Sequence, residues 1–586
     1  MQEHRFQGIG VSPGIACGRV QVNSGSVLSP KKYTVPDHLV ARERERLEQA
    51  LVQTRQQICD LQAQVLQRSG AESAGIFEAH LLVLEDHHAL EKVTKMVADA
   101  NVNVEFALWE VLQNYIENLR GLEDPYLRER SVDLEDVLQR ILRNLSSEGP
   151  IAPEENKHPH ILVSNDVTPS EFATLDEKVL GLATIAGSHT SHTAIMARAM
   201  DLPAVVGVHG LEGRLADGDE VLIDGYQGLL ILHPTKATKH GYERFEEAQS
   251  DLRTELSALS SQGAETIDGF RVTLSCNIEF AAELPRVHKV GAEGVGLYRT
   301  EFFYLNQQTL PTEEQLYTDY AKVIEGGGEA GVIIRTLDAG GDKIAGGIYQ
   351  EAEPNPFLGL RGIRLCLERK DWFRTQLRAI LRASTKGKVS IMFPLICGLD
   401  DFREARSCLE EARAELLKEG IAVSEDMEVG VMIEVPSAVV LAPRLAQEAD
   451  FLSVGTNDLV QYTLAVDRCN ERVSHLFSCH HPAILDSLHH VVSAAEGGEA
   501  WAGVCGEMAG DAVSIPLLIG LGFTELSVAP SQVLATKYAI RHLSKRECEA
   551  LVAECQKCDT AEDIRSRCLH FAAERYGKLL EAPESV

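Results

Sequence analysis

Eight short apolar runs, separated by helical patterns, fill the second half of the chain and constrain its fold more than any other feature. The runs are VTLSCNI (272–278), GVGLYR (294–299), GVIIRTLD (331–338), VSIMFP (389–394), VGVMIE (429–434), FLSVGT (451–456), WAGVCG (501–506) and ELSVAP (525–530). Helix-like stretches such as DDFREARSCLEEARAELLKEG (400–420) lie between them. Strands that alternate with helices in this way predict a (β/α)8 TIM barrel, which we place at residues 264–586.

The first half of the chain predicts a multidomain α/β arrangement. Residues 35–146 are dense in charge, and Leu47, Leu51 and Ile58 recur at the helical period, which predicts a bundle of antiparallel helices. Strand signals flank this bundle, at residues 5–22 and then at ILVSND (161–166), LATIAG (182–187), AVVGV (204–208), VLID (221–224) and LLIL (229–232). We therefore expect the bundle to be inserted into an α/β domain made of residues 1–34 and 147–235. The polar segment 236–263, with its thin apolar stripe, is predicted to be a linker helix.

Reactive side chains stand at the ends of the barrel strands, where the active sites of such barrels form. They are Asn277, Arg299, Glu301, Arg335, Asp338, Glu434, Asn457, Asp458, Cys505 and Glu507. Arginine forks recognise phosphate and carboxylate, and Arg361 and Arg468 add positive charge. Two carboxylates, such as Glu434 and Asp458, are what Mg²⁺ takes from a protein when the substrate completes its shell. The pattern predicts a small anion with phosphate and carboxylate groups, held with Mg²⁺; the alternative is a set of structural ion pairs.

Charge and cysteine content restrict the class of protein. The formal net charge of −31 argues against nucleic acid and anionic membrane as partners. No apolar run approaches the roughly 20 residues needed to span a bilayer, and the N-terminus has no apolar signal core. The 13 cysteines show no framework spacing, which favours reduced thiols and a cytoplasmic protein. The histidine-rich stretch HLFSCHHPAILDSLHH (475–490) matches no usual zinc spacing, so we expect surface or dimer contacts there.

Long motifs along the chain resemble those of the Enzyme I family of the bacterial sugar phosphotransferase system, the phosphoenolpyruvate–protein phosphotransferases. The matching stretches are GIGVSPGIA, TSHTAIMAR, LPAVVG, GLYRTEF, RTLDAGGDK, NPFLGLRGIR, MIEVPSA, SVGTNDLVQYTLAVDR and CGEMAGD. The resemblance implies that phosphoenolpyruvate phosphorylates a histidine, that pyruvate is released, and that the phosphoryl group passes to the phosphocarrier HPr for sugar uptake. It also implies Mg²⁺, HPr docking on residues 35–146, and a homodimer formed through the barrel.

The same resemblance assigns roles at the barrel mouth. Arg299 and Arg335 would hold the phosphate with Arg361 close by, and Glu434 and Asp458 would bind Mg²⁺. Asn457, Asp458 and Arg468 would engage the substrate, Arg468 on its carboxylate side. Cys505 would protonate the methylene carbon as the enolate becomes pyruvate, a task that suits a thiol at neutral pH.

Two histidines stand three apart in GSHTSHTAIMARAM (187–200), and the T-S-H-T register of the family selects His192 as the phosphorylated residue. Ser188 and His189 stand where the family usually has Gly-Arg. Helix-capping residues precede His192, which places it in a first helical turn that disfavours imidazolium and keeps the ring nucleophilic. A metal site on the two histidines would need further ligands, and the following AIMARAM offers none.

Other functions remain as alternatives. Pyruvate phosphate dikinase and phosphoenolpyruvate synthase share the histidine domain and the barrel, but they add an ATP-binding domain, and this chain has no glycine-rich nucleotide loop. A regulatory protein that binds phosphoenolpyruvate without catalysis would not need every reactive residue type present here. The sugars served downstream stay open, as does the choice between HPr and a nitrogen-type paralogue. We expect no sensory domain of the kind that often precedes the nitrogen-type enzyme, which favours HPr.

Overall fold

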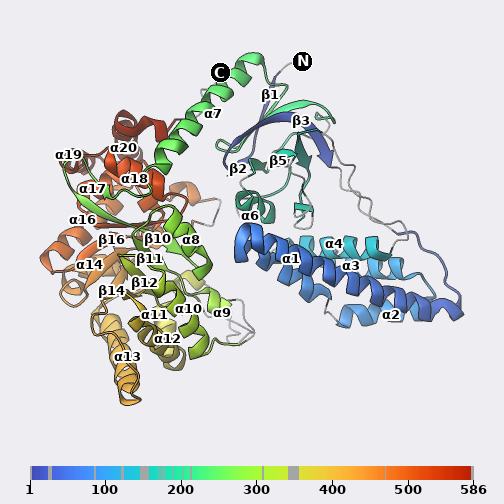
Figure 1. Cartoon of the computed structure of the whole chain (residues 1–586), viewed down its shortest axis with the longest axis horizontal. Coiled ribbons are helices and arrows are strands. Elements are labelled where there is room, and N and C mark those ends of the chain that lie inside the picture. Colours follow the sequence, from blue (N-terminus) through green and yellow to red (C-terminus); the bar gives the residue numbers. More distant parts are fainter. Residues whose placement is uncertain are drawn as a thin grey trace. The chain divides into compact units, whose positions relative to one another are not determined.

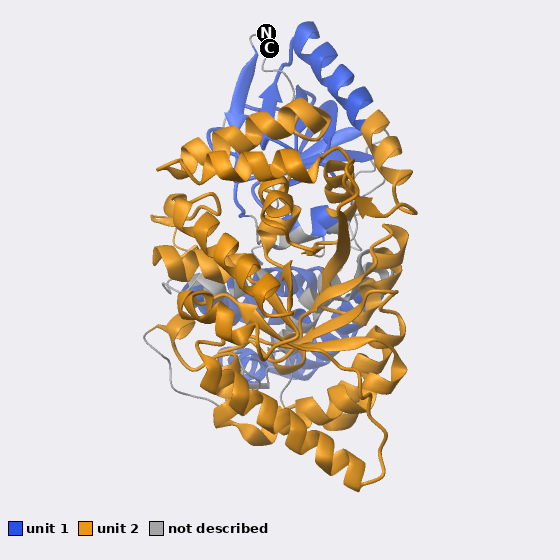
Figure 2. Cartoon of the chain, turned by 90° about the vertical axis from the view of Figure 1, so that its left-hand side faces the viewer, with its two compact units in different colours: residues 1–249, 582–586 blue, residues 250–581 orange. Residues whose placement is uncertain are grey.

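The computed structural model describes residues 3–23, 30–84, 87–120, 125–145, 158–168, 171–172, 175, 178–188, 191–200, 202–211, 214–305, 309–340, 355–468, 470 and 472–581. The chain forms two compact units, residues 1–249 and 250–581, which Figure 2 shows in different colours. Each unit has its own sheet and its own core. The multidomain α/β fold class predicted from the sequence is thereby confirmed.

The first unit is built on an eight-stranded mixed sheet with the order β1-β8-β7-β3-β4-β5-β6-β2. Its strands are β1 (His4–Gln7), β2 (Ile9–Ser12), β3 (Ile15–Asn23), β4 (His160–Ser164), β5 (Val179–Thr184), β6 (Ala204–Val206), β7 (Glu220–Asp224) and β8 (Leu229–Leu232). Strands β3 to β6 run parallel to one another, whereas β1, β8, β7 and β2 pair antiparallel with their neighbours. Because the central strand β4 is covered on both faces, all five of its residues are buried.

Four long helices between β3 and β4 form the inserted bundle of the first unit (Figure 1). They are α1 (Val40–Leu84), α2 (His87–Ala100), α3 (Val104–Arg120) and α4 (Pro125–Leu145), and a short turn of helix, η1 (Asp37–Leu39), precedes them. Pro125 opens α4, where its missing N–H costs nothing. The bundle shares one apolar core with a face of the sheet and with helix α6 (His192–Ala199), since Ile58 and Ile116 belong to the same cluster as Leu182 and Met196.

Helix α7 (Lys236–Ser257) contains the boundary between the two units. On its N-terminal half, Tyr242 is buried against Leu222 and Ile231 and its hydroxyl donates to Asp224 at 3.2 Å. On its C-terminal half, Leu252 is buried in the core of the second unit. Leu252 belongs to the apolar stripe seen in the sequence, whereas Tyr242 does not, and Gly241 lies inside a continuous helix. The domain limits at residues 34, 146, 235 and 263 stay a prediction.

The second unit is a closed barrel of parallel strands, as predicted. They are β10 (Arg271–Ile278), β11 (Gly294–Tyr298), β12 (Gly331–Arg335), β13 (Val389–Phe393), β14 (Val429–Ile433), β15 (Phe451–Val454), β16 (Trp501–Val504) and β17 (Glu525–Val528). Each strand pairs with the next, and β17 pairs back to β10, which closes the ring. The short strand β9 (Ala264–Glu265) adds an antiparallel edge to β10.

Helices cover the outside of the barrel. They are α8 (Leu284–Lys289), α9 (Phe302–Leu305), α10 (Glu313–Glu325), α11 (Ile363–Glu368), α12 (Lys370–Ala383), α13 (Leu399–Lys418), α14 (Pro436–Leu445), α15 (Thr456–Leu464), α16 (Pro482–Gly497), α17 (Ile515–Leu521), α18 (Val533–Arg541), α19 (Lys545–Cys555) and α20 (Ala561–Tyr576). The interior is filled by a small apolar cluster that includes Met392, Met432 and Cys505. No helix in the described ranges is both long and apolar enough to span a membrane.

Candidate active site

The carboxyl ends of the barrel strands bring most of the predicted residues to one mouth. Arg335 is the last residue of β12, Glu434 directly follows β14, and Asp458 lies in the first turn of α15, directly after β15. Cys505 directly follows β16. These side chains meet because the carboxyl ends of all parallel barrel strands lie at the same end of the barrel.

Two buried arginines are held by carboxylates at this mouth. Arg335 pairs with Glu301 and Asp338, each at 2.9 Å. Arg361 pairs with Asp338 at 3.0 Å and with Asp458 at 3.4 Å. The Nε atoms of both arginines are buried and have no hydrogen-bond partner among the described residues. A buried N–H group without a partner is costly, so two such groups in one site are donors suited to an anionic ligand.

Three carboxylates, from Asp338, Glu434 and Asp458, gather beside these arginines, with oxygens within 4.8 Å of one another. Glu434 is 2% exposed and accepts a hydrogen bond from the backbone N–H of Leu395 at 2.6 Å. Burial, together with the charges of Asp338 and Asp458, raises the pKa of Glu434 to about 8. An all-oxygen set of this kind fits a hard divalent cation, whose charge would replace the proton on Glu434.

Asp338 belongs to this carboxylate set, although the sequence only marked it as a strand-end residue. It follows β12 by three residues, on a different loop from Glu434 and Asp458. Sequence spacing cannot show that three loops converge on one point. The RTLD motif, which places Asp338 in the same turn as Arg335, was the available signal.

Arg299 and Arg468 lie nearer the rim. The Arg299 side chain is 42% exposed and pairs with Glu279 at 2.7 Å. Arg468 is 37% exposed and its Nη1 lies 3.5 Å from Asp458 Oδ1. Both arginines therefore keep their charge close to solvent, where a substrate can exchange with their present partners.

Cys505 is a buried thiol at the base of the mouth. It is 4% exposed, donates towards the carbonyl of Val454 at 3.7 Å, and packs in the same interior cluster as Met432. Burial raises the pKa of Cys505 to about 11. The group is therefore a neutral thiol at physiological pH, with a proton that it can donate.

Asn457 and two glycines complete the mouth. Asn457 and Glu507 are joined by two hydrogen bonds, at 3.0 and 3.1 Å. A Cβ atom on Gly455 would lie 2.9 Å from Glu434 Oε2, and one on Gly506 would lie 2.0 Å from Thr456 Oγ1. The loops after β15 and β16 therefore approach each other as closely as their backbones allow.

The predicted histidine lies at the start of α6 in the first unit. The helix begins at His192, and Ser191 caps it by accepting a hydrogen bond from the backbone N–H of Ala194 at 3.4 Å. Thr193 donates to Asp166 Oδ1 at 3.0 Å and is 3.1 Å from the carbonyl of Val167, which fixes this first turn. Gly187 has a φ of 120°, which favours glycine in the loop before the helix. The side chain of His192, as well as His189 and Thr190, lies outside the described residues.

Comparisons with known proteins agree with this architecture. The chain matches three families: PEP-utilising enzyme, N-terminal, over residues 7–130; PEP-utilising enzyme, mobile domain, over 156–228; and PEP-utilising enzyme, PEP-binding domain, over 253–545. A barrel with this mouth, joined to such a mobile domain, defines a phosphoenolpyruvate-utilising enzyme.

Full-length relatives narrow this class. The protein named phosphoenolpyruvate-protein phosphotransferase from Priestia megaterium is 41% identical to this chain, over 95% of this chain and 97% of its own length. The protein of the same name from Bacillus subtilis is 40% identical, over 96% of this chain and 98% of its own length. The solved structure titled as an NMR solution structure of Enzyme I is 33% identical, covers 42% of this chain and 99% of its own, and has a TM-score of 0.34. The chain belongs to the phosphoenolpyruvate-protein phosphotransferase family, and it is a transferase that uses phosphoenolpyruvate for phosphotransfer. The alternatives of a dikinase, a phosphoenolpyruvate synthase and a non-catalytic regulator are set aside.

Proposed function

We propose that the protein moves the phosphoryl group of phosphoenolpyruvate onto His192 and then onto the phosphocarrier HPr, as the first step of sugar uptake in the cytoplasm. The observation that supports this most is the pair of buried Nε–H groups of Arg335 and Arg361, which lie beside three carboxylates and have no hydrogen-bond partner among the described residues. Fixed cationic donors next to a divalent-cation site are what a small phosphorylated carboxylate needs.

In this proposal different arginines bind the phosphate group and the carboxylate group of the substrate. Arg335 and Arg361 bind the phosphate through their Nε–H groups, and Arg299 adds its charge when it exchanges Glu279 for the substrate. Arg468 engages the substrate on its carboxylate side, and Asn457 and Asp458 also engage the substrate. The guanidinium groups also offset the charge that develops as the phosphoryl group leaves.

Glu434 and Asp458, joined by Asp338, would hold Mg²⁺ at this mouth. Their oxygens suit this hard cation, which would neutralise the oxygens of the substrate when bound. Burial beside two other carboxylates raises the pKa of Glu434, so this residue would give up its proton when the cation binds.

The chemical step uses one nucleophile and one acid. A neutral ring nitrogen of His192 attacks phosphorus, the bond between phosphorus and the bridging oxygen breaks, and enolpyruvate leaves with the electron pair. The Cys505 thiol then gives its proton to the methylene carbon, which forms pyruvate and leaves a thiolate. The raised pKa of Cys505 keeps that proton in place until the enolate arrives.

Transfer to HPr uses the first unit. The start of α6 favours a neutral imidazole before the transfer and a phosphoryl group after it, because both respond to the N-terminal end of the helix. We propose that HPr docks on the bundle of residues 35–146, and that residues 264–586 form a homodimer through the barrel. Residues 1–34 and 147–235 would act as the phosphohistidine domain, and residues 236–263 as its linker.

One labelling experiment tests this function. Full-length protein is incubated with phosphoenolpyruvate labelled on its phosphoryl group, with and without Mg²⁺, and then with HPr or a nitrogen-type paralogue. We expect Mg²⁺-dependent label on the protein, one pyruvate for each phosphoryl group, and passage of the label to HPr. Label that stays on the protein with either acceptor, or that appears without Mg²⁺, would contradict the proposal.

A further inference from the structure

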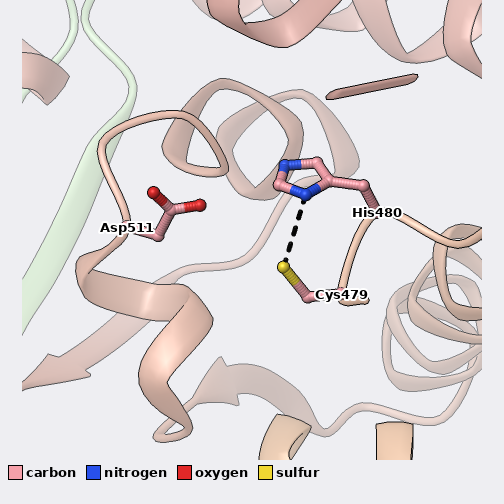
Figure 3. Close-up of side chains that lie close together, drawn as sticks. All are labelled: Cys479, His480 and Asp511. Atoms are coloured by element: carbon pink, nitrogen blue, oxygen red, sulfur yellow. Dashed lines mark hydrogen bonds between the residues drawn. The ribbon is translucent and has the colours of Figure 1, made fainter. Parts of the chain in front are cut away.

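A second cluster of metal-binding side chains lies in the barrel unit and shares no residue with the carboxylate set. Cys479, His480 and Asp511 each offer one ligand atom, and these atoms lie within 4.8 Å of one another. Figure 3 shows Cys479 and His480 on one loop, with the carboxylate of Asp511 opposite them. Sulfur, nitrogen and oxygen together are the ligand types of zinc-like cations, unlike the all-oxygen set at the barrel mouth.

The geometry of the first two ligands fits a tetrahedral ion. Cys479 Sγ lies 3.5 Å from His480 Nδ1. Zinc binds sulfur at about 2.3 Å and imidazole nitrogen at about 2.0–2.1 Å, so a tetrahedral angle separates these two ligands by about 3.5–3.6 Å. The observed separation, which is that of a hydrogen bond between the two atoms, therefore matches the spacing of two zinc ligands.

Ser514 orients the other side of the cluster. Its hydroxyl is fully buried, lies 3.1 Å from His480 Nε2, and donates a hydrogen bond to Asp511 Oδ2. When Nε2 carries the imidazole hydrogen, it donates to Ser514 and leaves the lone pair of Nδ1 directed at Cys479. Metal-binding histidines usually have such a partner on their second nitrogen, which fixes the ring and its tautomer.

Burial keeps His480 in the form that binds metal. His480 is 4% exposed, whereas Cys479 and Asp511 are half-buried, so an ion can enter from their side. Burial lowers the pKa of His480 and keeps it in the neutral form that binds metal, and it raises the pKa of the Cys479 thiol. Arg565 is the nearby cation acting on both residues, and Asp511 opposes it. An ion that binds must therefore displace the thiol proton.

The place of the cluster in the fold explains why sequence spacing did not reveal it. Cys479 and His480 immediately precede α16, whereas Asp511 and Ser514 follow β16 and the short helix η8 (Glu507–Gly510). We expected surface or dimer contacts in the histidine-rich run because its own spacing supplies no zinc pattern. The third ligand instead comes from the loop after the next strand, which the barrel brings alongside.

We propose that Cys479, His480 and Asp511 bind a divalent cation of the zinc class, with a water molecule as the fourth ligand. The bound ion would join the loop before α16 to the segment between β16 and α17, which also contains Cys505 and Glu507. It therefore stabilises the barrel next to its mouth, without entering the transfer reaction. Zinc itself and cobalt, its spectroscopic substitute, are the two probes.

Cobalt titration of the full chain tests the site directly. We expect one equivalent of Co²⁺ to give a thiolate-to-cobalt charge-transfer absorption, which Zn²⁺ abolishes by displacement. Cys479→Ser, which changes one atom, should remove this absorption, and His480→Asn or Asp511→Asn should weaken Co²⁺ binding by at least about tenfold. Ser514→Ala should weaken it by about 10–100-fold, the range for a lost outer partner.

Control variants separate this site from others. Cys558→Ser removes a half-buried thiol outside the cluster and should leave the absorption unchanged. Cys505→Ala and Glu434→Gln, which alter the barrel mouth, should also leave it unchanged. With Mg²⁺ present at saturating concentration to fill the barrel-mouth site, Zn²⁺ should raise the melting temperature of the wild type and of Cys558→Ser, but not that of Cys479→Ser. Under the same conditions Zn²⁺ should release a proton from the wild type and none from Cys479→Ser.

Two results would overturn the site. Absence of the charge-transfer absorption in folded wild-type protein would show that the cluster is a hydrogen-bonded network around Ser514. Survival of the absorption in Cys479→Ser, or its loss in Cys505→Ala, would place the ion elsewhere. Circular dichroism on each variant confirms that the comparison is between folded proteins, and Cys479→Ser decides the question if Asp511→Asn does not fold.

Discussion

Arg335 and Asp338 form an ion pair of 2.9 Å across the turn that ends strand β12. This turn joins the anion-binding arginines to the carboxylate set, since the Nε–H of Arg335 has no partner among the described residues and Asp338 belongs to the carboxylate set. Arg335 also keeps Glu301 as a partner at 2.9 Å, so its position does not depend on Asp338 alone.

Asp338→Asn should therefore raise the Mg²⁺ concentration needed for half-maximal turnover by about 10–100-fold, because it removes one of three converging carboxylates. Transfer from phospho-HPr back to His192 should be unchanged, since that reaction uses the first unit. Asp486→Asn, at an exposed position in α16, is the matched control. Equal loss in both directions would show that Asp338 supports the fold and not the metal.

The histidine assignment predicts a difference between two neighbours. His192→Ala should abolish labelling from phosphoenolpyruvate, because it removes the nucleophile at the start of α6. His189→Ala should only slow labelling. Both are measured as protein-bound label under saturating Mg²⁺. If His189→Ala takes up no label and His192→Ala is still labelled, the assignment of the phosphorylated histidine is wrong.

Cys505→Ala should lower the rate of pyruvate formation by about 10²–10⁴-fold, the range for loss of a positioned acid, while phosphoenolpyruvate still binds. Cys276→Ala, which removes another buried barrel thiol, is the control. Pyruvate release and equilibrium binding of phosphoenolpyruvate are measured separately. If the thiol only packs in the interior cluster, both variants will turn over at nearly the wild-type rate.

Glu434 predicts how stability depends on pH when no divalent cation is present. Its pKa is about 8 in the folded chain, against 4.5 for an ordinary glutamate, mainly because of burial. Between these two values the folded state binds more protons than the unfolded state, so the free energy of unfolding falls as pH rises and levels off above about 8. Below about 4.5 this contribution is fully present.

Thermal melts in chelator at pH 5.5 and pH 8.5 check this sign. Glu434→Gln stays neutral, so it should lose less stability between the two pH values than the wild type does. Mg²⁺ should stabilise the wild type most at the higher pH, where Glu434 gives up its proton readily. Identical pH dependence in the two proteins would show that Glu434 is ionised throughout.

The sequence was enough to predict the site residues that stand at strand ends, but not the contacts that form where separate loops meet. Glu434, Asp458 and Cys505 could be placed because each follows a readable apolar run. The role of Asp338 and the meeting of His480 with Asp511 could not, because both depend on which loops the closed barrel brings together. Tyr242 was missed for a related reason: a single aromatic residue in a polar helix gives no periodic signal, although it is buried against β7 and β8.

The division of labour between the units gives the last prediction. The arginines, the carboxylates and Cys505 all belong to residues 250–581, whereas His192 belongs to residues 1–249. A fragment of residues 1–260 retains all of α7, including the contact of Tyr242 with Asp224 that attaches this helix to the first sheet. It should fold, bind HPr and accept a phosphoryl group from phospho-HPr, yet stay unlabelled by phosphoenolpyruvate. An isolated barrel fragment should bind phosphoenolpyruvate without turnover. Because Leu252 would lose its cover in fragment 1–260, Leu252→Ser in that fragment should improve solubility without changing HPr transfer. Direct labelling of fragment 1–260 by phosphoenolpyruvate would contradict the assignment of substrate binding to the barrel.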